Sequence, residues 1–128
     1  MEQEKIVIRV GIVWLGKDEI ARVIHDPGTE LTLADAQETM AAYVKVTKGK
    51  RLPLFVDTKK MKSMTREVRL YYASEEAAKQ ASAVAIIVDT PVSRVLGNFY
   101  LGLSHPRLPS RLFTSEHEAL KWLKGFLQ

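Results

Sequence analysis

The residues best suited to bind a ligand or partner follow one short apolar segment. Leu52–Val56 is almost entirely apolar, Asp57 and Thr58 come next, and a basic stretch then leads into the start of a helix. In open α/β folds, ligands and partners bind beyond the carboxyl ends of the strands. We therefore predict a binding site here, together with Asp89 at the end of the next strong strand. The candidate binding residues are Asp57, Thr58, Lys59, Lys60, Lys62, Ser63, Thr65, Arg66, Arg69 and Asp89.

Positive charge is concentrated in the same part of the chain. The formal net charge is +4, and residues 45–69 alone contain nine basic and two acidic side chains. A local excess of positive charge attracts a small anion, an anionic lipid or an acidic protein surface. The same excess is also typical of a solvated surface with no partner at all, so both interpretations stay open.

Arg66 and Arg69 are spaced one helical turn apart, which allows two guanidinium groups to hold one anion. Tyr71 and Tyr72 follow, and aromatic rings beside arginines can stack on bases. No nucleic-acid-binding motif accompanies them, so we do not expect a nucleic acid partner. Ser63 or Thr65 can cap the helix or accept a phosphate near its N-terminus, and capping is the commoner role.

The sequence offers little for catalysis or metal binding. It has no cysteine, and its three histidines show no metal-ligand spacing. His25 precedes Asp-Pro-Gly, so we place it in a solvent-facing turn, and we expect His117 to be exposed in the last helix. Neither a phosphate-binding glycine loop nor a Gly-x-Ser-x-Gly motif is present. We therefore expect no enzymatic activity, no metal and no cofactor.

Strand and helix signals alternate along the chain. An antiparallel hairpin is predicted first, and helices and strands alternate from Thr32 onward. The predicted elements are strands at 5–14, 19–24, 52–56, 83–89 and 111–113, and helices from Thr32 to Thr47, from Ser63 or Thr65 to Tyr72, from Ser74, from Thr90-Pro91 and from Ser115. This order favours one α/β domain over residues 1–128, with a mixed, mostly parallel sheet of about five strands, an N-terminal hairpin and about four helices.

Three segments resemble the STAS family, to which the sporulation anti-anti-sigma factor SpoIIAA belongs. They are Leu54-Phe55-Val56-Asp57, Ala85-Ile86-Ile87-Val88, and the closing run from Arg111 to Leu123 with its Glu-Ala-x-x-Trp-Leu pattern. The resemblance follows the order of elements over nearly the whole chain. It implies a SpoIIAA-like fold, of an uncharacterised bacterial branch, and a non-enzymatic module that binds a protein partner.

One departure from that family bears on regulation. Its anti-anti-sigma factors carry an Asp-Ser-Ser-Gly-like motif after this strand, with a phosphorylated serine, whereas this chain has Met64-Thr65-Arg66-Glu67. We therefore predict an interaction or regulatory module without that phosphorylation motif. The alternative is a small-ligand or lipid-binding domain of the same fold, with Met61, Met64, Phe99 and Tyr100 lining an apolar cavity.

The cellular location is predicted from two patterns that the sequence lacks. It has no run of eighteen apolar residues and no signal-peptide pattern, so we expect a cytoplasmic protein without a membrane span. An exposed sheet edge favours pairing of two copies, so a homodimer is also expected.

Overall fold

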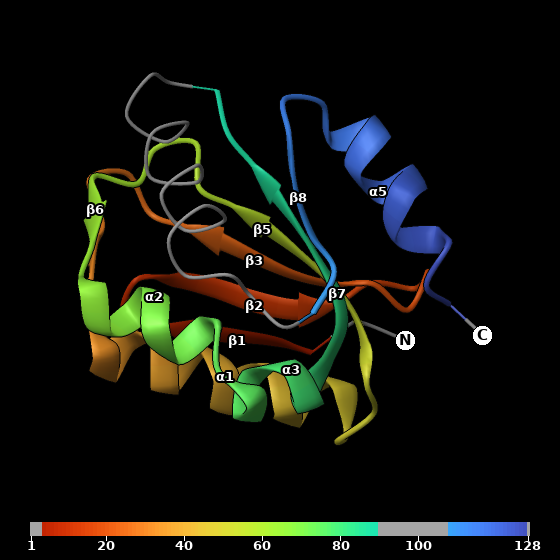
Figure 1. Ribbon diagram of the computed structural model, residues 1–128, viewed down its shortest axis with the longest axis horizontal. Coiled ribbons are helices and arrows are strands. Elements are labelled where there is room, and N and C mark those ends of the chain that lie inside the picture. Colours follow the sequence, from red (N-terminus) through yellow and green to blue (C-terminus); the bar gives the residue numbers. More distant parts are fainter. Residues whose placement is uncertain (1–3, 90–107, 128) are drawn as a thin grey trace.

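A central β-sheet carries helices on both of its sides (Figure 1). The structure is a computed structural model that describes residues 4–89 and 108–127. Its strands are β1 (Lys5–Ile8), β2 (Gly11–Leu15), β3 (Ala21–His25), β4 (Glu30–Leu31), β5 (Leu52–Asp57), β6 (Ser63–Met64), β7 (Ala81–Ile87) and β8 (Ser110–Phe113). Its helices are α1 (Leu33–Thr47), α2 (Arg66–Tyr72), α3 (Glu75–Gln80) and α5 (Glu116–Lys124).

The main sheet is mixed and mostly parallel. Its six strands lie in the order β1-β2-β3-β5-β7-β8. The pairs β1–β2 and β2–β3 are antiparallel, and the pairs from β3 to β8 are parallel. The predicted α/β class and the N-terminal hairpin are confirmed, and β5 lies in the interior of the sheet. The sheet has one strand more than the five expected, because the first predicted strand is divided.

The predicted strand over residues 5–14 is two strands that fold back on each other at Arg9 and Val10. The turn is fixed from two sides, since Val10 is buried and the guanidinium of Arg9 binds Asp35 of α1. Gly11 then lies so close to β3 that a Cβ atom on it would overlap the carbonyl oxygen of Ile24. A glycine is therefore required where the chain enters β2.

Helix α1 begins and ends where the sequence predicts. Thr32 is its N-cap in a capping box with Asp35, and the chain leaves the helix through Lys48 and Gly49, with φ of 55° and 78°. Hydrogen bonds from Arg9 hold the pKa of the Asp35 carboxyl well below its usual range. A charged pair therefore ties the start of α1 to the first turn of the sheet.

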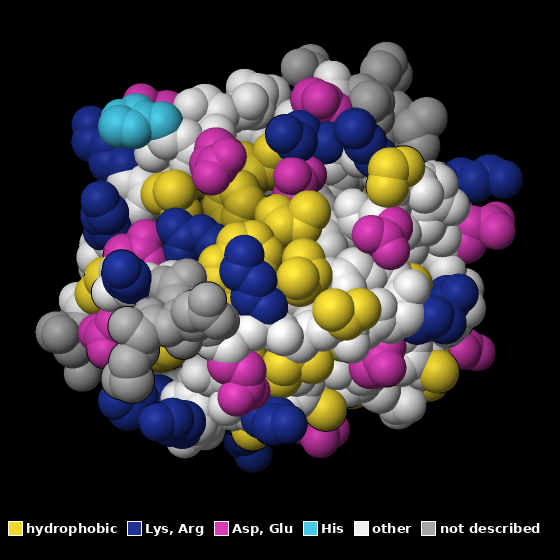
Figure 2. All heavy atoms as spheres, turned by 180° about the vertical axis from the view of Figure 1, so that it is seen from behind, with side chains coloured by type: hydrophobic (Ala, Val, Ile, Leu, Met, Phe, Trp, Pro, Cys, Tyr) yellow, Lys and Arg dark blue, Asp and Glu magenta, His cyan; other side chains and the backbone are white. Residues whose placement is uncertain are grey.

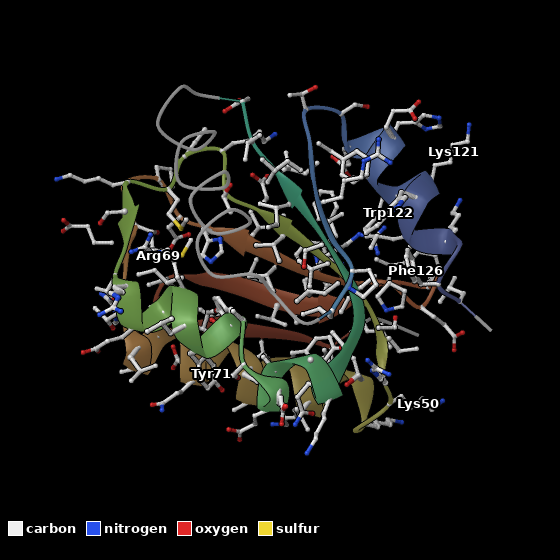
Figure 3. All side chains as sticks on the ribbon, viewed as in Figure 1. Lys50, Arg69, Tyr71, Lys121, Trp122 and Phe126 are labelled. Atoms are coloured by element: carbon white, nitrogen blue, oxygen red, sulfur yellow. The ribbon has the colours of Figure 1, made fainter. Side chains whose placement is uncertain are left out.

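The two faces of the sheet carry separate clusters of buried side chains. Adjacent residues of a strand point to opposite faces, so Leu54 faces α1 while Phe55 faces α5. On the α5 face, Leu123 is fully buried among alanines of β7. Figure 3 shows Trp122 and Phe126 side by side at the end of α5, with ring centroids 4.9 Å apart.

The shorter elements complete the α1 side. Thr65 caps α2 and Ser74 caps α3, as the sequence predicts, whereas Ser63 belongs to β6. Strands β4 and β6 form a two-stranded parallel sheet that sequence patterns did not indicate. The helix predicted after Thr90-Pro91 lies outside the described residues.

Candidate functional site

The predicted binding segment begins at the carboxyl end of β5, next to β7. The main-chain N–H and the hydroxyl of Thr58 both donate to the carbonyl oxygen of Ile87, at 3.0 and 2.7 Å. The carboxylate of Asp57 accepts from the N–H of Lys59 at 2.9 Å, and the Lys59 ammonium lies 3.7 Å from it. Asp57 and buried Thr58 therefore hold the loop against the sheet.

The rest of the loop is bound to the chain segment before α1. The N–H groups of Lys62 and Ser63 donate to the carbonyl of Thr29, and Gly28 donates to the carbonyl of Lys60. The ammonium of Lys62 lies 3.9 Å from the carboxylate of Glu30, and both side chains are exposed. This loop has a defined shape, with Lys60 and Lys62 on its surface.

The remaining predicted residues lie around the start of α2 and the end of β7. The hydroxyl of Thr65 accepts from the N–H of Val68 at 3.2 Å, which is the capping role. Arg66 is exposed, Arg69 is half-buried, and Asp89 is exposed just past β7. Because β5 and β7 are parallel neighbours, Asp57 and Asp89 follow strands that end at the same edge. Binding by any of these residues remains a prediction.

The basic stretch does not form one continuous patch. Lys50 and Arg69 lie far apart, on opposite sides of the molecule (Figure 3). The reason is β5, because six residues of extended strand separate the basic residues before it from those after it. Arg51, at the first end, uses its guanidinium to bind the carbonyls of Ala78 and Ala81. The charge counted along the sequence is therefore divided between two places.

A cavity lies on the α1 side of the sheet. It has a volume of about 80 Å³ and lies between β3, β5, β7, α1 and the elements α2 and α3. Its wall is largely apolar and includes Val23, Leu54, Met61 and Met64. The prediction that Met61 and Met64 line an apolar cavity is thus confirmed, while Phe99 and Tyr100 lie outside the described residues.

His25 contributes an imidazole to this cavity. It is the last residue of β3 and is only 8% exposed, so its predicted place in a solvent-facing turn is wrong. Alternation explains the burial, since Ala21, Val23 and His25 all point to the α1 face of the sheet. The ring nitrogen Nδ1 lies 2.9 Å from the carbonyl oxygen of Asp57. Burial lowers the pKa of His25 below its usual value, against the weaker effect of nearby carboxylates.

Three hydroxyl groups of the cavity wall already donate to main-chain carbonyls. Thr39 donates to the carbonyl of Asp35, Thr58 to that of Ile87, and Tyr43 to that of Leu52. Burial raises the pKa of Tyr43 to about 12, so its phenol stays protonated. The Nε2 atom of His25 is buried and has no hydrogen-bond partner. No other described residue that lines the cavity has such an atom.

An apolar strip of the sheet lies uncovered on the opposite face. Strand register places Val7, Ile12, Trp14 and Ile24 on the face where α5 packs over β5, β7 and β8. Val7 is 79% exposed, and the other three are half-buried. Hydrophobic side chains also gather at the centre of the face shown in Figure 2, bordered by charged ones.

Neither a metal site nor a membrane-spanning helix is found in residues 4–89 and 108–127. They contain no cluster of three or more histidine, cysteine, aspartate or glutamate side chains able to hold a metal ion. In the same residues, no helix has the length and apolar character that crossing a bilayer requires. His117 is exposed in the first turn of α5, as expected.

Comparison with solved structures identifies the fold. The chain is similar to an uncharacterised protein of the DUF3478 family with a SpoIIAA-like fold from Shewanella loihica PV-4, at a TM-score of 0.55 and 14% identity, over 95% of this chain and 92% of that one. The expected SpoIIAA-like fold is thereby confirmed. A protein of unknown function from Arthrobacter sp. FB24 is 35% identical over 92% of this chain and 95% of that one, with a TM-score of 0.36.

The family follows from the sequence itself. Residues 13–127 match the model of a domain of unknown function, DUF7793, and the chain belongs to that family. No curated protein matches the chain. Any function must therefore be argued from the geometry of the molecule.

Proposed function

We propose that this protein is a non-enzymatic binding domain that takes a small apolar ligand into the cavity on the α1 side of its sheet. The observation that carries the proposal is an apolar cavity of about 80 Å³ beside the buried side chains of the α1 side. Protein interiors leave few voids larger than a water molecule. An empty cavity of this size costs roughly 2 kcal/mol of stability, which a fitting ligand restores.

The polar groups around the cavity favour binding over catalysis. Its hydroxyl groups donate to main-chain carbonyls, and His25 is oriented by a carbonyl and not by a carboxylate. No hydrogen bond in the described residues joins the imidazole to a nucleophile. A general base needs such a partner within hydrogen-bond distance.

A matched pair of variants tests the proposal. Ala77 of α3 lines the cavity, so Ala77→Leu fills it, whereas Ala41→Leu adds the same atoms on the exposed side of α1. Toluene titrated into the ¹⁵N-labelled protein is expected to shift the amide signals of cavity residues in the wild type and in Ala41→Leu, but not in Ala77→Leu. The same shifts in all three proteins, or none in the wild type, contradict the proposal.

A protein-interaction module is the second candidate, and the uncovered apolar strip at Val7 favours it. Lys60 and Lys62 supply exposed charge at the predicted edge, which suits an acidic partner. Replacing Lys59, Lys60 and Lys62 by glutamate is expected to abolish capture of such a partner, and an unchanged pull-down profile argues against it. Light scattering tests the homodimer, which Val7→Glu is expected to dissociate.

A further inference from the structure

The hydrogen bond of His25 determines which ring nitrogen carries the proton. A carbonyl oxygen accepts hydrogen bonds and cannot donate them, so Nδ1, at 2.9 Å from the oxygen of Asp57, is the N–H group. In a neutral imidazole the other nitrogen then holds a lone pair. Nε2 is therefore a hydrogen-bond acceptor in the neutral ring.

The surroundings of the ring keep it neutral near pH 7. Burial lowers the pKa of His25 from 6.5, although Asp57, Asp26 and Asp35 act in the opposite direction. The carbonyl of Asp57 also raises the pKa through its hydrogen bond to the ring, and the three carboxylates belong to β5, to the loop after His25 and to α1. The uncharged phenol of Tyr43 lines the same cavity. An uncharged ring is also the form that suits an apolar wall.

Residues 4–89 and 108–127 supply no hydrogen-bond donor to this acceptor. Nε2 is buried and lacks a hydrogen-bond partner, and the hydroxyls of Thr39, Thr58 and Tyr43 give their protons to main-chain carbonyls. Buried polar atoms are nearly always hydrogen-bonded, and exceptions often mark a place for something that the protein chain itself does not provide. Here the missing group is a donor placed inside the cavity.

The volume of the cavity limits the size of the ligand that carries this donor. A water molecule occupies about 10–15 Å³ on this measure, so about 80 Å³ holds roughly five to eight such positions. A molecule no larger than a small substituted ring is the most that this space can hold. Its apolar atoms match the side chains of Val23, Leu54 and Met61.

We propose that the cavity selects a neutral, ring-sized apolar molecule with one hydroxyl group, and that this hydroxyl donates a hydrogen bond to Nε2 of His25. The inference rests on the proposed function, because it names the class of ligand for the same cavity. A carboxylate does not fit, since it brings no proton to Nε2 and places a charge against an apolar wall.

The test compares three probes of similar shape in the full chain at pH 8. Phenol donates a hydrogen bond, anisole carries the same oxygen without its hydrogen, and toluene has no oxygen. Wild-type protein is expected to bind phenol about tenfold more tightly than anisole, measured by the shifts of its amide signals. The ¹⁵N signal of His25 Nε2 is expected to move when phenol is added and not when anisole is added, a measurement that needs no variant.

Variants of His25 separate the hydrogen bond from the shape of the cavity. His25→Leu is expected to bind phenol and anisole equally, and His25→Gln, whose amide can donate to Asp57 and still accept, is expected to recover part of the preference. Equal affinities in the wild type, or tighter binding of benzoate than of phenol, overturn the inference but leave the ligand cavity in place. If none of the three probes binds the wild-type protein, both the inference and the proposed function are wrong.

Discussion

The two faces of the sheet are filled in different ways. On the α5 face, alanines of β7 let the helix approach closely, and the rings of Phe113, Trp122 and Phe126 close the end of the layer. On the α1 face, flexible methionines and a buried histidine surround a cavity. One face is therefore built for stability, while the other gives up contacts that a ligand can replace.

The largest expected effect comes from truncating the closely filled face. Leu123 is fully buried against the alanines of β7, so Leu123→Ala removes contacts that its rigid neighbours cannot restore. We expect a loss of about 3 kcal/mol in the free energy of unfolding, measured by urea denaturation. Leu120→Ala, on a half-buried side chain of the same helix, is the control and should cost less. Equal losses would mean that the α5 face is not closely filled.

Adding volume tests the comparison in the opposite direction. Ala119 is fully buried on the α5 face, and Ala77 lines the cavity on the α1 side. Ala119→Leu is expected to destabilise the protein by about 2 kcal/mol, because the larger side chain has no space. Ala77→Leu is expected to leave the stability unchanged or raise it. Thermal unfolding measures the stability of both variants relative to the wild type. A similar loss of stability in both variants would contradict the presence of a cavity.

The helices also differ in how their first turns are held. Asp35 completes the capping box of α1 and binds Arg9, whereas Ser115 caps α5 through one hydrogen bond from the N–H of Glu118. Asp35→Asn is therefore expected to cost about 1–2 kcal/mol, and Ser115→Ala about 1 kcal/mol or less. Since the pKa of Asp35 is lowered on folding, its contribution is present above about pH 4 and is lost as the pH falls further. Urea denaturation at pH 7 and pH 3 measures both effects.

What the sequence predicts well are the local signals. Thr32, Thr65 and Ser74 were identified as helix caps because capping depends on a few neighbouring residues, and β5 was recognised from its uninterrupted apolar run. The parallel pair β4–β6 escaped prediction because each strand is two residues long and its partner lies far away in the chain.

The candidate site was predicted only in part. Met61 and Met64 were named as lining a cavity only in the alternative of a ligand-binding domain, and His25 was assigned to a turn because Asp-Pro-Gly follows it. Alternation from Ala21 through Val23 was the signal that would have placed His25 inside. Its contact with the carbonyl of Asp57 depends on the register of β3 against β5, which local sequence does not contain.

The smallest effect concerns the protonation of His25 on the α1 face. Folding lowers its pKa below 6.5, so between the two pKa values the unfolded chain binds a proton that the folded protein does not. Stability therefore falls as the pH drops below about 6.5, with a slope that cannot exceed that of one proton, about 1.4 kcal/mol per pH unit. His25→Gln should remove this part of the pH dependence, and His117→Gln, on an exposed histidine of α5, should keep it. Unfolding curves from pH 8 to pH 5 distinguish the two variants. A wild-type slope that survives in His25→Gln would mean that another group causes it and that folding does not lower the pKa of His25.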